Sequence, residues 1–352
     1  LAFTNANGIT HTWNAATGVL TLTGSATIAN YKAALESITY DNTNDDNPNT
    51  NNRTVTWTVY DGDNYSAPAT STIAVTAAND APGAADAGAT LAFKEGDGAS
   101  VIDATLTLTD VDDTNLESAT VQITAGHQSA EDVLGFTNQS GITGSYNSTN
   151  GTLTLTGSAT KAQYETALES VTYNNTSDTP NTGNRTVTWI VNDGDTGSTA
   201  ITSTITVAVD NDAPTVSGND ATLAYTENDG AVLIDSTLSL ADVDNANLSG
   251  ATITISSGFR AGGEDVLSFT SANGITGAFN NTTGVLALSG NATKAQYETA
   301  LETVKYENTS ENPNTGNRTV SWVVTDGTAN SSAVYSTITV ASADNDAPSL
   351  GG

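Results

Sequence analysis

Acidic residues recur in this chain in five groups, which keep the same order from one stretch of sequence to the next. The first is a Glu beside a turn, the second Asp-x-Asp followed by Asn, the third Glu-Asp, the fourth Asp-Gly, and the fifth a linker before Ala-Pro. In that order the members are Glu95 and Glu227; Asp110, Asp112 and Asn115 with Asp242, Asp244 and Asn247; Glu131-Asp132 and Glu264-Asp265; Asp61, Asp193 and Asp326; and Asn79-Asp80, Asp210-Asn211-Asp212 and Asp344-Asn345-Asp346. These side chains supply oxygen atoms, so the chemistry they favour is the binding of a hard cation.

Calcium is the cation that this set of residues fits best. It takes about six to eight oxygen ligands, and an Asp-x-Asp loop can direct two carboxylates at one ion, whereas magnesium prefers a small shell rich in water. Zinc and copper are poorly served by two His and no Cys, and neither His11 nor His127 has a counterpart in another copy. The alternative is that Asp, Asn and Gly serve only as turn formers, but five groups in one register favour calcium.

The acidic groups recur because the sequence itself repeats. Residues 134–195 and 267–328 match almost position for position, and both match residues 1–63, with a shift of 133 residues from Leu1 to Leu134 and again from Leu134 to Leu267. This period is too long for a solenoid repeat and fits a self-standing domain with its own core. We therefore expect a partial repeat at 1–82, complete repeats at 83–214 and 215–348, and the start of another repeat or a tail at 349–352.

Short alternating runs separated by Gly, Asn and Asp predict an all-β fold. In the second copy the runs are 105–108, 120–123, 152–155, 185–191 and 203–207. Period-two alternation with one apolar face is typical of half-buried antiparallel strands. Many such strands in one copy predict an Ig-like Greek-key β-sandwich, and the tandem copies predict an extended rod.

One segment of the second copy, repeated in the third, has the pattern of a short α-helix instead. A capping box is followed by apolar residues on one helical face. The residues are Thr160, Gln163, Tyr164, Leu168 and Val171, and the pattern recurs from Thr293 to Val304. We expect a helix of two to three turns whose Tyr and Leu side chains belong to the core.

The charge of the chain excludes several classes of partner. With 39 acidic and 9 basic residues the net charge is −30, which argues against nucleic acid and anionic membranes. So acidic a chain repels itself unless cations neutralise it, although solubility is an alternative reason for scattered Asp and Glu. No Cys is present, no apolar run of about 18 residues predicts a membrane span, and no signal peptide is visible. Because residue 1 falls inside a repeat, we expect a segment of a longer protein.

The order of the acidic motifs resembles the cadherin repeat. That repeat has Glu near the first strand, an Asp-x-Asp loop, an acidic pair, Asp-Gly near the penultimate strand and an Asp-Asn-Asp-Ala-Pro linker. The resemblance covers essentially the whole chain, and the linker and Asp-x-Asp motifs are its most specific parts. The inserted helix and the following PNTGNRTV sequence depart from animal cadherins. They are similar to the cadherin-like tandem repeats of large calcium-dependent bacterial surface adhesins, of the type I-secreted RTX-adhesin type.

In that family calcium lies at the joint between consecutive domains and stiffens it. Between the second and third copies the resemblance implies Glu95, Asp210, Asn211, Asp212, Asp242, Asp244, Asn247 and Asp326 as ligands, with Glu131 and Asp132 as additions. Between the first and second copies it implies Asn79, Asp80, Asp110, Asp112, Asn115 and Asp193. There Ala78 stands where Asp210 would be, so we expect fewer or weaker ions. At the last linker it implies an incomplete site with Glu227, Asp344 and Asp346.

The residues and the resemblance together imply a structural role at the cell surface or outside the cell. We expect a calcium-stiffened extender segment of a bacterial adhesin or extracellular fibre, involved in adhesion or in a biofilm matrix. Its partners would be neighbouring repeats and, in a fibre, other copies of the chain, without nucleic acid and without direct membrane insertion. We expect no enzyme, because no Ser-His-Asp set recurs.

The alternative function is a module that binds glycans or further copies of itself. Trp57, Trp189 and Trp322 recur, but they share one alternating strand position, which favours the core over sugar stacking. Trp13 is unmatched by another Trp, and its counterparts are Tyr146 and Phe279.

The first copy lacks the opening strands of its sandwich. Either the segment was cut arbitrarily, which we favour, or another chain supplies those strands by β-strand addition. Frequent Asn-x-Ser/Thr sequences, such as those beginning at Asn52, Asn184 and Asn317, leave glycosylation open.

Overall fold

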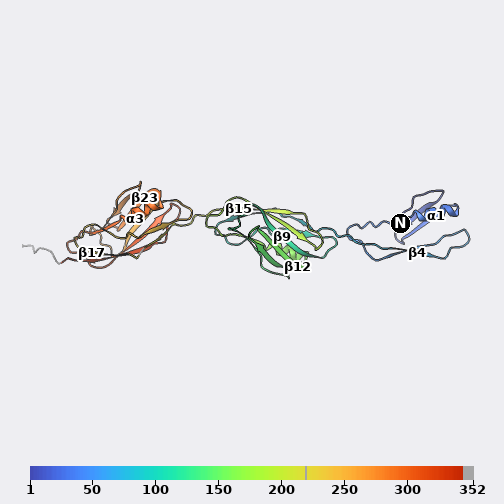
Figure 1. Ribbon diagram of the computed structural model, residues 1–352, viewed down its shortest axis with the longest axis horizontal. Helices are drawn as coiled ribbons and strands as arrows, with labels where there is room; N and C mark the ends of the chain where they lie inside the picture. Colours follow the sequence, from blue (N-terminus) through green and yellow to red (C-terminus); the bar gives the residue numbers. More distant parts are fainter. Residues whose placement is uncertain (219, 344–352) are drawn as a thin grey trace, which may run out of the picture.

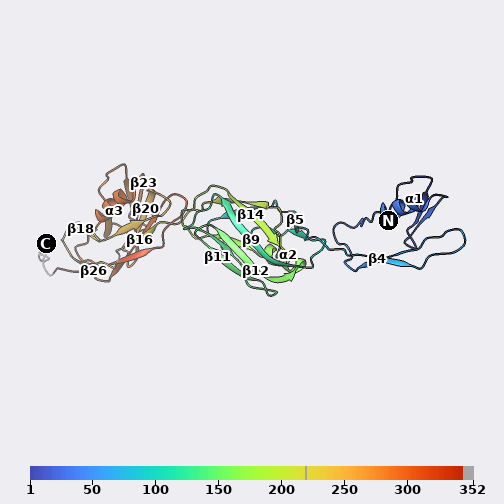
Figure 2. The same cartoon turned by 45° about the vertical axis from the view of Figure 1, so that its right-hand side comes forward.

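The structure, a computed structural model, describes residues 1–218 and 220–343. Figures 1 and 2 show the three repeat copies one after another along the long axis of the molecule. We refer to residues 1–82 as copy 1, residues 83–214 as copy 2, and the described residues from 215 onward as copy 3. Copies 2 and 3 are β-sandwiches that each carry one short helix.

Copy 2 is an Ig-like Greek-key sandwich. Its strands are β5 (Gly83–Ala85), β6 (Thr90–Lys94), β7 (Ser100–Val101), β8 (Thr107–Thr109), β9 (Asn115–Ala125), β10 (Asp132–Gly135), β11 (Thr143–Asn147), β12 (Thr152–Thr160), β13 (Thr172–Asn175), β14 (Arg185–Asn192) and β15 (Ile201–Ala208), and its helix is α2 (Lys161–Glu169). The large sheet has the order β11-β12-β9-β14-β15-β6, and the smaller sheets are β10-β13-β7 and β5-β8. Buried side chains from these sheets form one core.

Copy 3 repeats this architecture. Its elements are β16 (Thr215–Ser217), β17 (Thr222–Thr226), β18 (Val232–Leu233), β19 (Ser239–Ala241), β20 (Asn247–Ser257), β21 (Asp265–Ser268), β22 (Thr276–Asn280), β23 (Val285–Thr293), α3 (Lys294–Glu302), β24 (Lys305–Asn308), β25 (Arg318–Thr325) and β26 (Val334–Ala341). The large sheet runs β22-β23-β20-β25-β26-β17, beside β18-β24-β21 and β16-β19. It has a separate core of its own.

The alternating sequence pattern explains which side chains form these cores. On β14, Val187, Trp189 and Val191 are at most 1% exposed, whereas the residues between them lie on the outer face. Trp322 occupies the same position in copy 3 and is fully buried. The prediction that these two Trp residues belong to the core is therefore confirmed, and their recurrence is no evidence for sugar stacking.

The predicted helices are also confirmed. The Thr160 hydroxyl accepts a hydrogen bond from Gln163 N, and the Gln163 side chain accepts one from Thr160 N, which completes the capping box. Tyr164 and Leu168 of α2 are buried in the core, and the Tyr164 hydroxyl donates to Gly157 O at 2.7 Å. The helix α3 has the same cap, at Thr293.

One alternating run, 105–108, was predicted as a strand and is only partly one, because β8 begins at Thr107. The carboxylate of Asp103 accepts hydrogen bonds from the backbone N and the hydroxyl of Thr105, at 3.1 and 2.7 Å. This local side-chain bonding competes with strand pairing and bends the chain before β8.

Copy 1 consists of β1 (Thr10–Asn14), β2 (Val19–Thr23), α1 (Ile28–Glu36), β3 (Arg53–Trp57) and β4 (Ala69–Ile73). The pairs β1-β2 and β3-β4 form two separate sheets. Their counterparts in copy 2 are joined by β9, and no strand of the described copy 1 corresponds to it. As a result, Trp57 is only half-buried, although its Nε1 donates to Ser71 Oγ at 2.9 Å.

Candidate metal centres at the joints between copies

The strand pairing places acidic residues at both ends of each sandwich. Strands β6 and β15 are parallel, with Lys94 opposite Ala208, so Glu95 and Asp210 both emerge at the end that faces copy 3. There Glu95 Oε2 accepts a hydrogen bond from Asp210 N at 2.9 Å. We call this contact region joint 2, and the region between copies 1 and 2 joint 1.

The opposite end of each sandwich carries the Asp-x-Asp loop. Because β9 and β14 are antiparallel, with Ser118 opposite Asn192, the loop before β9 and the loop after β14 lie together. These loops hold Asp110 and Asp193. The matching loops of copy 3, before β20 and after β25, face copy 2 across joint 2 (Figure 1).

The Asp-x-Asp loop is a tight turn that leaves one carboxylate oxygen free. In copy 3, Asp242 Oδ1 accepts hydrogen bonds from Asp244 N and Asn245 N, at 3.1 and 2.7 Å. Asp242 is only 9% exposed, and its Oδ2 is buried without a hydrogen-bond partner in the described chain. Asp110 Oδ2 in copy 2 is buried and unpartnered in the same way. A buried carboxylate oxygen without a donor is unfavourable, so it is a candidate ligand for a cation.

The linker of joint 2 connects these groups across the two copies. Asp212 N donates to Asp244 Oδ2 at 2.6 Å, and Asn211 Nδ2 donates to Asp326 Oδ2 at 2.8 Å. Asn245 Nδ2 in turn donates to Asn211 Oδ1 at 3.0 Å. The structure therefore brings together the linker residues Asn211 and Asp212 with Asp244 and Asp326 of the following copy.

Joint 1 repeats these contacts. Asp80 N donates to Asp112 Oδ2 at 3.1 Å, and Asn79 Nδ2 donates to Asp193 Oδ2 at 3.0 Å. A further bond runs from Asn47 Nδ2 to Val111 O at 3.1 Å. The predicted linker and loop residues of joint 1 thus also lie side by side.

The carboxylates of joint 2 repel one another. Partial desolvation, and then the charges of Asp244 and Asp178, raise the pKa of Asp212. Desolvation also raises the pKa of Glu95, against the hydrogen bond from Asp210 N, and the charge of Asp212 adds to the increase. Protonation is favoured because it relieves this repulsion, and a divalent cation would relieve it by the same physics.

Joint 1 contains carboxylates that joint 2 lacks. Oxygens of Asp110, Asp113 and Asp193 lie within 4.8 Å of one another, although copy 3 has Asn245 at the position of Asp113. Desolvation, and then the charges of Asp112 and Asp110, raise the pKa of Asp113. The expectation of fewer or weaker ions at joint 1 rested on Ala78 and on the absence of an upstream Glu from this segment, and it stays a prediction beside these additional charges.

Two predicted residues take no part in these hydrogen bonds within the described chain. Asn115 is exposed at the start of β9, and its Nδ2 donates to Ser158 Oγ at 3.3 Å. Asn247 is exposed at the same position of β20. Within the described residues no hydrogen bond links either side chain to the carboxylates, so their role as ligands stays a prediction.

The acidic pair of the third group has a different role. The Asp132 carboxylate is buried against Arg185, with Nη2 at 3.0 Å, and accepts a bond from the Tyr173 hydroxyl at 2.7 Å. Glu131 accepts a bond from Asn181 N at 3.1 Å. The proposal that Glu131 and Asp132 add to the joint is therefore corrected, because both carboxylates are held by Arg185 and its neighbouring loop. Glu264, Asp265 and Arg318 repeat this arrangement.

The sequence interpretation missed three acidic residues near the joints. Asp113 extends the Asp-x-Asp loop, and Asp178 and Asp46 contribute to the raised pKa values of Asp212 and Asp80. A signal did exist, because Asp46, Asp178 and Glu311 occupy equivalent positions of the three copies.

The last linker lies mostly outside the described residues, which include neither Asp344 nor Asp346. Glu227, which corresponds to Glu95, is 5% exposed. Its Oε2 accepts a bond from Ala343 N at 2.9 Å, and its Oε1 is buried without a partner in the described chain. Glu227 is thus held as a candidate ligand at the outer end of copy 3.

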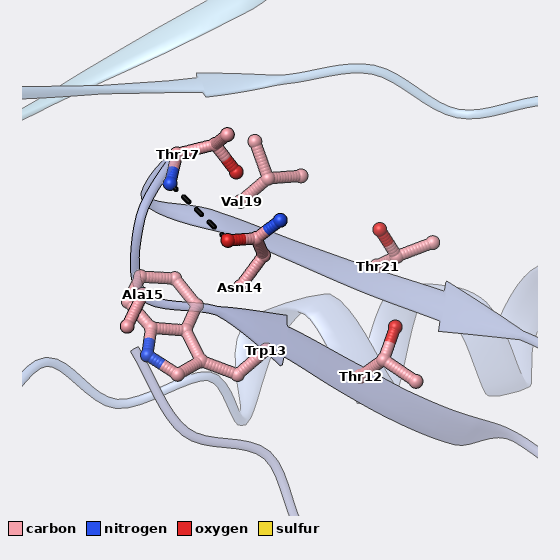
Figure 3. Close-up of a pocket in the computed structure, with 7 residues that line it drawn as sticks. All are labelled: Thr12, Trp13, Asn14, Ala15, Thr17, Val19 and Thr21. Carbon is pink, nitrogen blue, oxygen red and sulfur yellow. Dashed lines mark hydrogen bonds between the residues drawn. The ribbon is translucent and has the colours of Figure 1, made fainter.

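A shallow hollow lies on the β1–β2 hairpin beside Trp13 (Figure 3). Trp13 is 43% exposed. In copy 2 its counterpart Tyr146 packs against the core, and its hydroxyl donates to Asp132 O at 2.9 Å. Copy 1 as described has no counterpart of Asp132 to hold the Trp13 ring in place, so the exposure of Trp13 is no evidence for a glycan site.

The donor set at the joints fits calcium. The ligand atoms on offer are carboxylate and amide oxygens from both sides of each joint, several of them buried and unpartnered. Hard oxygen donors in a cluster of this charge suit calcium, and no His or Cys is among them.

No helix in the described part of the chain is long and apolar enough to span a membrane, since each of the three has nine residues.

Comparison with known proteins gives one curated relative and several solved structures. No family model matches the chain. Halomucin of Haloquadratum walsbyi is 33% identical over 132 residues, which is 35% of this chain and 1% of that protein. The matched length is close to the period of 133 residues seen within this chain.

The solved structures to which the chain is similar include several cadherin domains. Domains 1–5 of protocadherin gamma B2 are 13% identical, with a TM-score of 0.29 and coverage of 84% of this chain and 46% of that chain. Drosophila N-cadherin domains 1–4 are 12% identical, with a TM-score of 0.23 and coverage of 82% and 58%. Human mucin-like protocadherin domains 1–2 are 13% identical, with a TM-score of 0.26 and coverage of 74% and 98%. Because these scores are low, the fold rests on the strand order and pairings described above.

Proposed function

We propose that this chain is an extender segment of a large surface adhesin or extracellular fibre, and that calcium stiffens its joints. The observation that carries the proposal is the carboxylate of Asp242, which is 9% exposed and has a buried oxygen without a partner at joint 2. A second buried oxygen, on Asp110, lies in the same place at joint 1. Both are set in clusters of carboxylates that raise one another's pKa.

Residues of both copies would hold the ion at each joint. At joint 2 we assign Glu95, Asp210, Asn211, Asp212, Asp242, Asp244 and Asp326. At joint 1 we assign Asn79, Asp80, Asp110, Asp112, Asp113 and Asp193. When bound, calcium supplies two positive charges that offset the repulsion among these oxygens. The linker amides of Asp212 and Asn211 keep the carboxylates of copy 3 oriented toward copy 2.

The segment would act as a rod of autonomous domains, with boundaries at residues 82 and 214. Copies 2 and 3 have separate cores, so bending is concentrated at the joints, which contain few apolar contacts. The proposal includes an extracellular location and a role in adhesion or in a matrix, as suits a relative named halomucin. It assigns no enzymatic activity to the chain.

The test is a calcium titration of the whole chain followed by small-angle scattering, with Asp242→Asn as the matched variant. The substitution keeps the oxygen that accepts the Asp244 and Asn245 amides and removes the free charge. With calcium, we expect the distance distribution of wild type to extend to longer distances and to become narrower. We expect the apparent affinity at joint 2, read from hydrogen exchange of loop peptides, to fall about tenfold in the variant. Superimposable scattering profiles with calcium and with chelator would overturn the proposal.

A further inference from the structure

We propose that Lys161 and Lys294, the first residues of the inserted helices, are positioning residues for the cation sites. Each holds the Asp-x-Asp loop in its ligand-presenting shape before any ion arrives. The inference rests on the proposed function and adds to it the part of each copy that builds the site.

The contacts are the same in both copies. Lys294 Nζ donates to Asp242 O and to Asn245 O, both at 2.7 Å. Lys161 Nζ donates to Asp110 O at 3.0 Å and also to Asp113 O. Each ammonium thus bridges the first and last residues of the turn, about fifty positions away in sequence.

Helix stability does not account for these lysines. Lys161 and Lys294 are the first residues of α2 and α3, where the helix dipole disfavours a positive charge. Copy 1 has Ile28 at this position, 90% exposed, at the start of α1. Within the described residues, the positive charge is therefore found in the two copies that contain the Asp-x-Asp loop.

The lysine and the two loop amides together hold the turn in one conformation. Asp242 Oδ1 is occupied by the amides of Asp244 and Asn245, and the outer carbonyls are occupied by Lys294. Asp242 as a residue is 9% exposed, and its Oδ2 has no hydrogen-bond partner in the described chain. This oxygen is therefore the one available to the ion. Without the lysine, two carbonyls would lose their partner and the turn would have to be ordered by the ion itself.

Two effects of the lysine on calcium oppose each other. Its charge repels the ion, but it is bonded to carbonyls and this repulsion is screened by solvent and salt. Because the lysine already orders the turn, calcium binding does not have to offset the whole conformational entropy that the turn loses on ordering. We therefore expect preorganisation to exceed repulsion, so that removal of the lysine weakens binding.

The experiment compares wild type with Lys294→Met, Lys294→Arg and the control Lys305→Met by hydrogen exchange of the whole chain. Lys305 is in the same copy, and its side chain has no hydrogen bond or ion pair within the described residues. In chelator, we expect the peptide that contains residues 242–245 to exchange at least tenfold faster in Lys294→Met. We expect Lys294→Arg to restore part of the protection, and Lys305→Met and the core peptide 318–325 to match wild type. With calcium, we expect the apparent affinity at joint 2 to be at least tenfold weaker in Lys294→Met alone.

The outcomes separate this inference from the proposed function. If wild type does not respond to calcium, the proposed function is wrong, and faster loop exchange in chelator still supports the positioning role. If wild type binds calcium and Lys294→Met has unchanged loop exchange and affinity, the positioning role is overturned. Faster exchange of the core peptide 318–325 as well would assign Lys294 to general stability and would also overturn it.

Discussion

The side-chain amide of Asn211 donates a hydrogen bond of 2.8 Å to the carboxylate of Asp326, across the joint between copies 2 and 3. The residues are 115 positions apart, and the same bond joins Asn79 to Asp193 at 3.0 Å at the other joint. The linker is therefore attached to the following copy by a side chain, in addition to its own backbone. We expect this attachment to limit bending at each joint even without an ion.

Replacement of Asn211 with Ala should loosen joint 2 in the absence of calcium. A hydrogen bond of this kind contributes about 1 kcal/mol, so the population of bent joints should increase roughly fivefold. Small-angle scattering in chelator should show a broader distance distribution. Asn184→Ala, which removes an exposed amide without a hydrogen bond among the described residues, is the control. Equal profiles for the two variants would mean that the Asn211 bond does not restrain the joint.

Much of the fold could be predicted from local sequence. Neighbouring residues determine both the capping box at Thr160 and Gln163 and the alternation around Trp189. The sequence alone therefore predicts both features. The run at 105–108 was only partly correct, because Asp103 forms hydrogen bonds with Thr105 that alternation does not reveal.

The candidate site was predicted from the aligned copies, and its gaps have physical causes. Asp113 was missed because its match in copy 3 is the amide Asn245, whereas Asp178 was missed although its matches Asp46 and Glu311 are also acidic. Asp132 was misplaced because its partner Arg185 lies 53 residues away and becomes a neighbour only in the folded sheet. Composition alone cannot separate an acid that faces a joint from an acid that pairs in the core.

The effect of pH on the joints should change sign with calcium. Desolvation, and then neighbouring charges, raise the pKa values of Asp212 and Asp80 above their ordinary value of 3.8, so these groups bind protons more readily in the folded chain. Without calcium, the closed joint should therefore gain stability as the pH falls through these raised values toward 3.8, and lose it as the pH rises through them. With calcium, the same protonation should release the ion and loosen the joint.

Scattering at constant ionic strength, in chelator and in calcium, checks this reversal between pH 7 and pH 4. Protonation of Asp326 sets the lower end of the pH range in which the closed joint without calcium gains stability. Burial opposes the ionisation of Asp326, but hydrogen bonds from Ala329 N and Asn211 outweigh it and lower its pKa. Its contribution to stability is present above the ordinary pKa and is lost as the pH falls through the lowered value. The same trend with and without calcium would contradict the account.

Removal of Arg185 should destabilise copy 2 strongly. Arg185 is fully buried, and its Nη2 lies 3.0 Å from Oδ1 of Asp132, which is 1% exposed. Arg185→Met leaves the carboxylate buried without its counter-charge, at a cost of about 3–5 kcal/mol. Hydrogen exchange of peptides from copies 2 and 3 in urea measures this loss, with copy 3 as the internal reference.

The double variant with Asp132→Asn should recover part of this loss, because it no longer buries an unpaired charge. Arg53→Met in copy 1 is the matched control. Arg53 occupies the equivalent position, and no ion pair of its side chain occurs within the described residues. If Arg185→Met costs no more than Arg53→Met, the buried pair does not stabilise the sandwich.

Replacement of Lys94 with Thr should increase the calcium affinity of joint 2. Lys94 Nζ lies 2.9 Å from Asp210 Oδ1, and this ion pair lowers the pKa of Asp210 together with the hydrogen bond from Asn211 N. A cation that binds Asp210 must displace or share this lysine, which copy 3 replaces with Thr226. Both side chains are about half exposed, so solvent screens the pair, and the affinity should rise by no more than about fivefold. Calcium titration followed by exchange of the 242–245 peptide measures the change, with the 110–113 peptide of joint 1 as the internal control. An unchanged or weaker affinity would show that Asp210 does not take part in holding the ion.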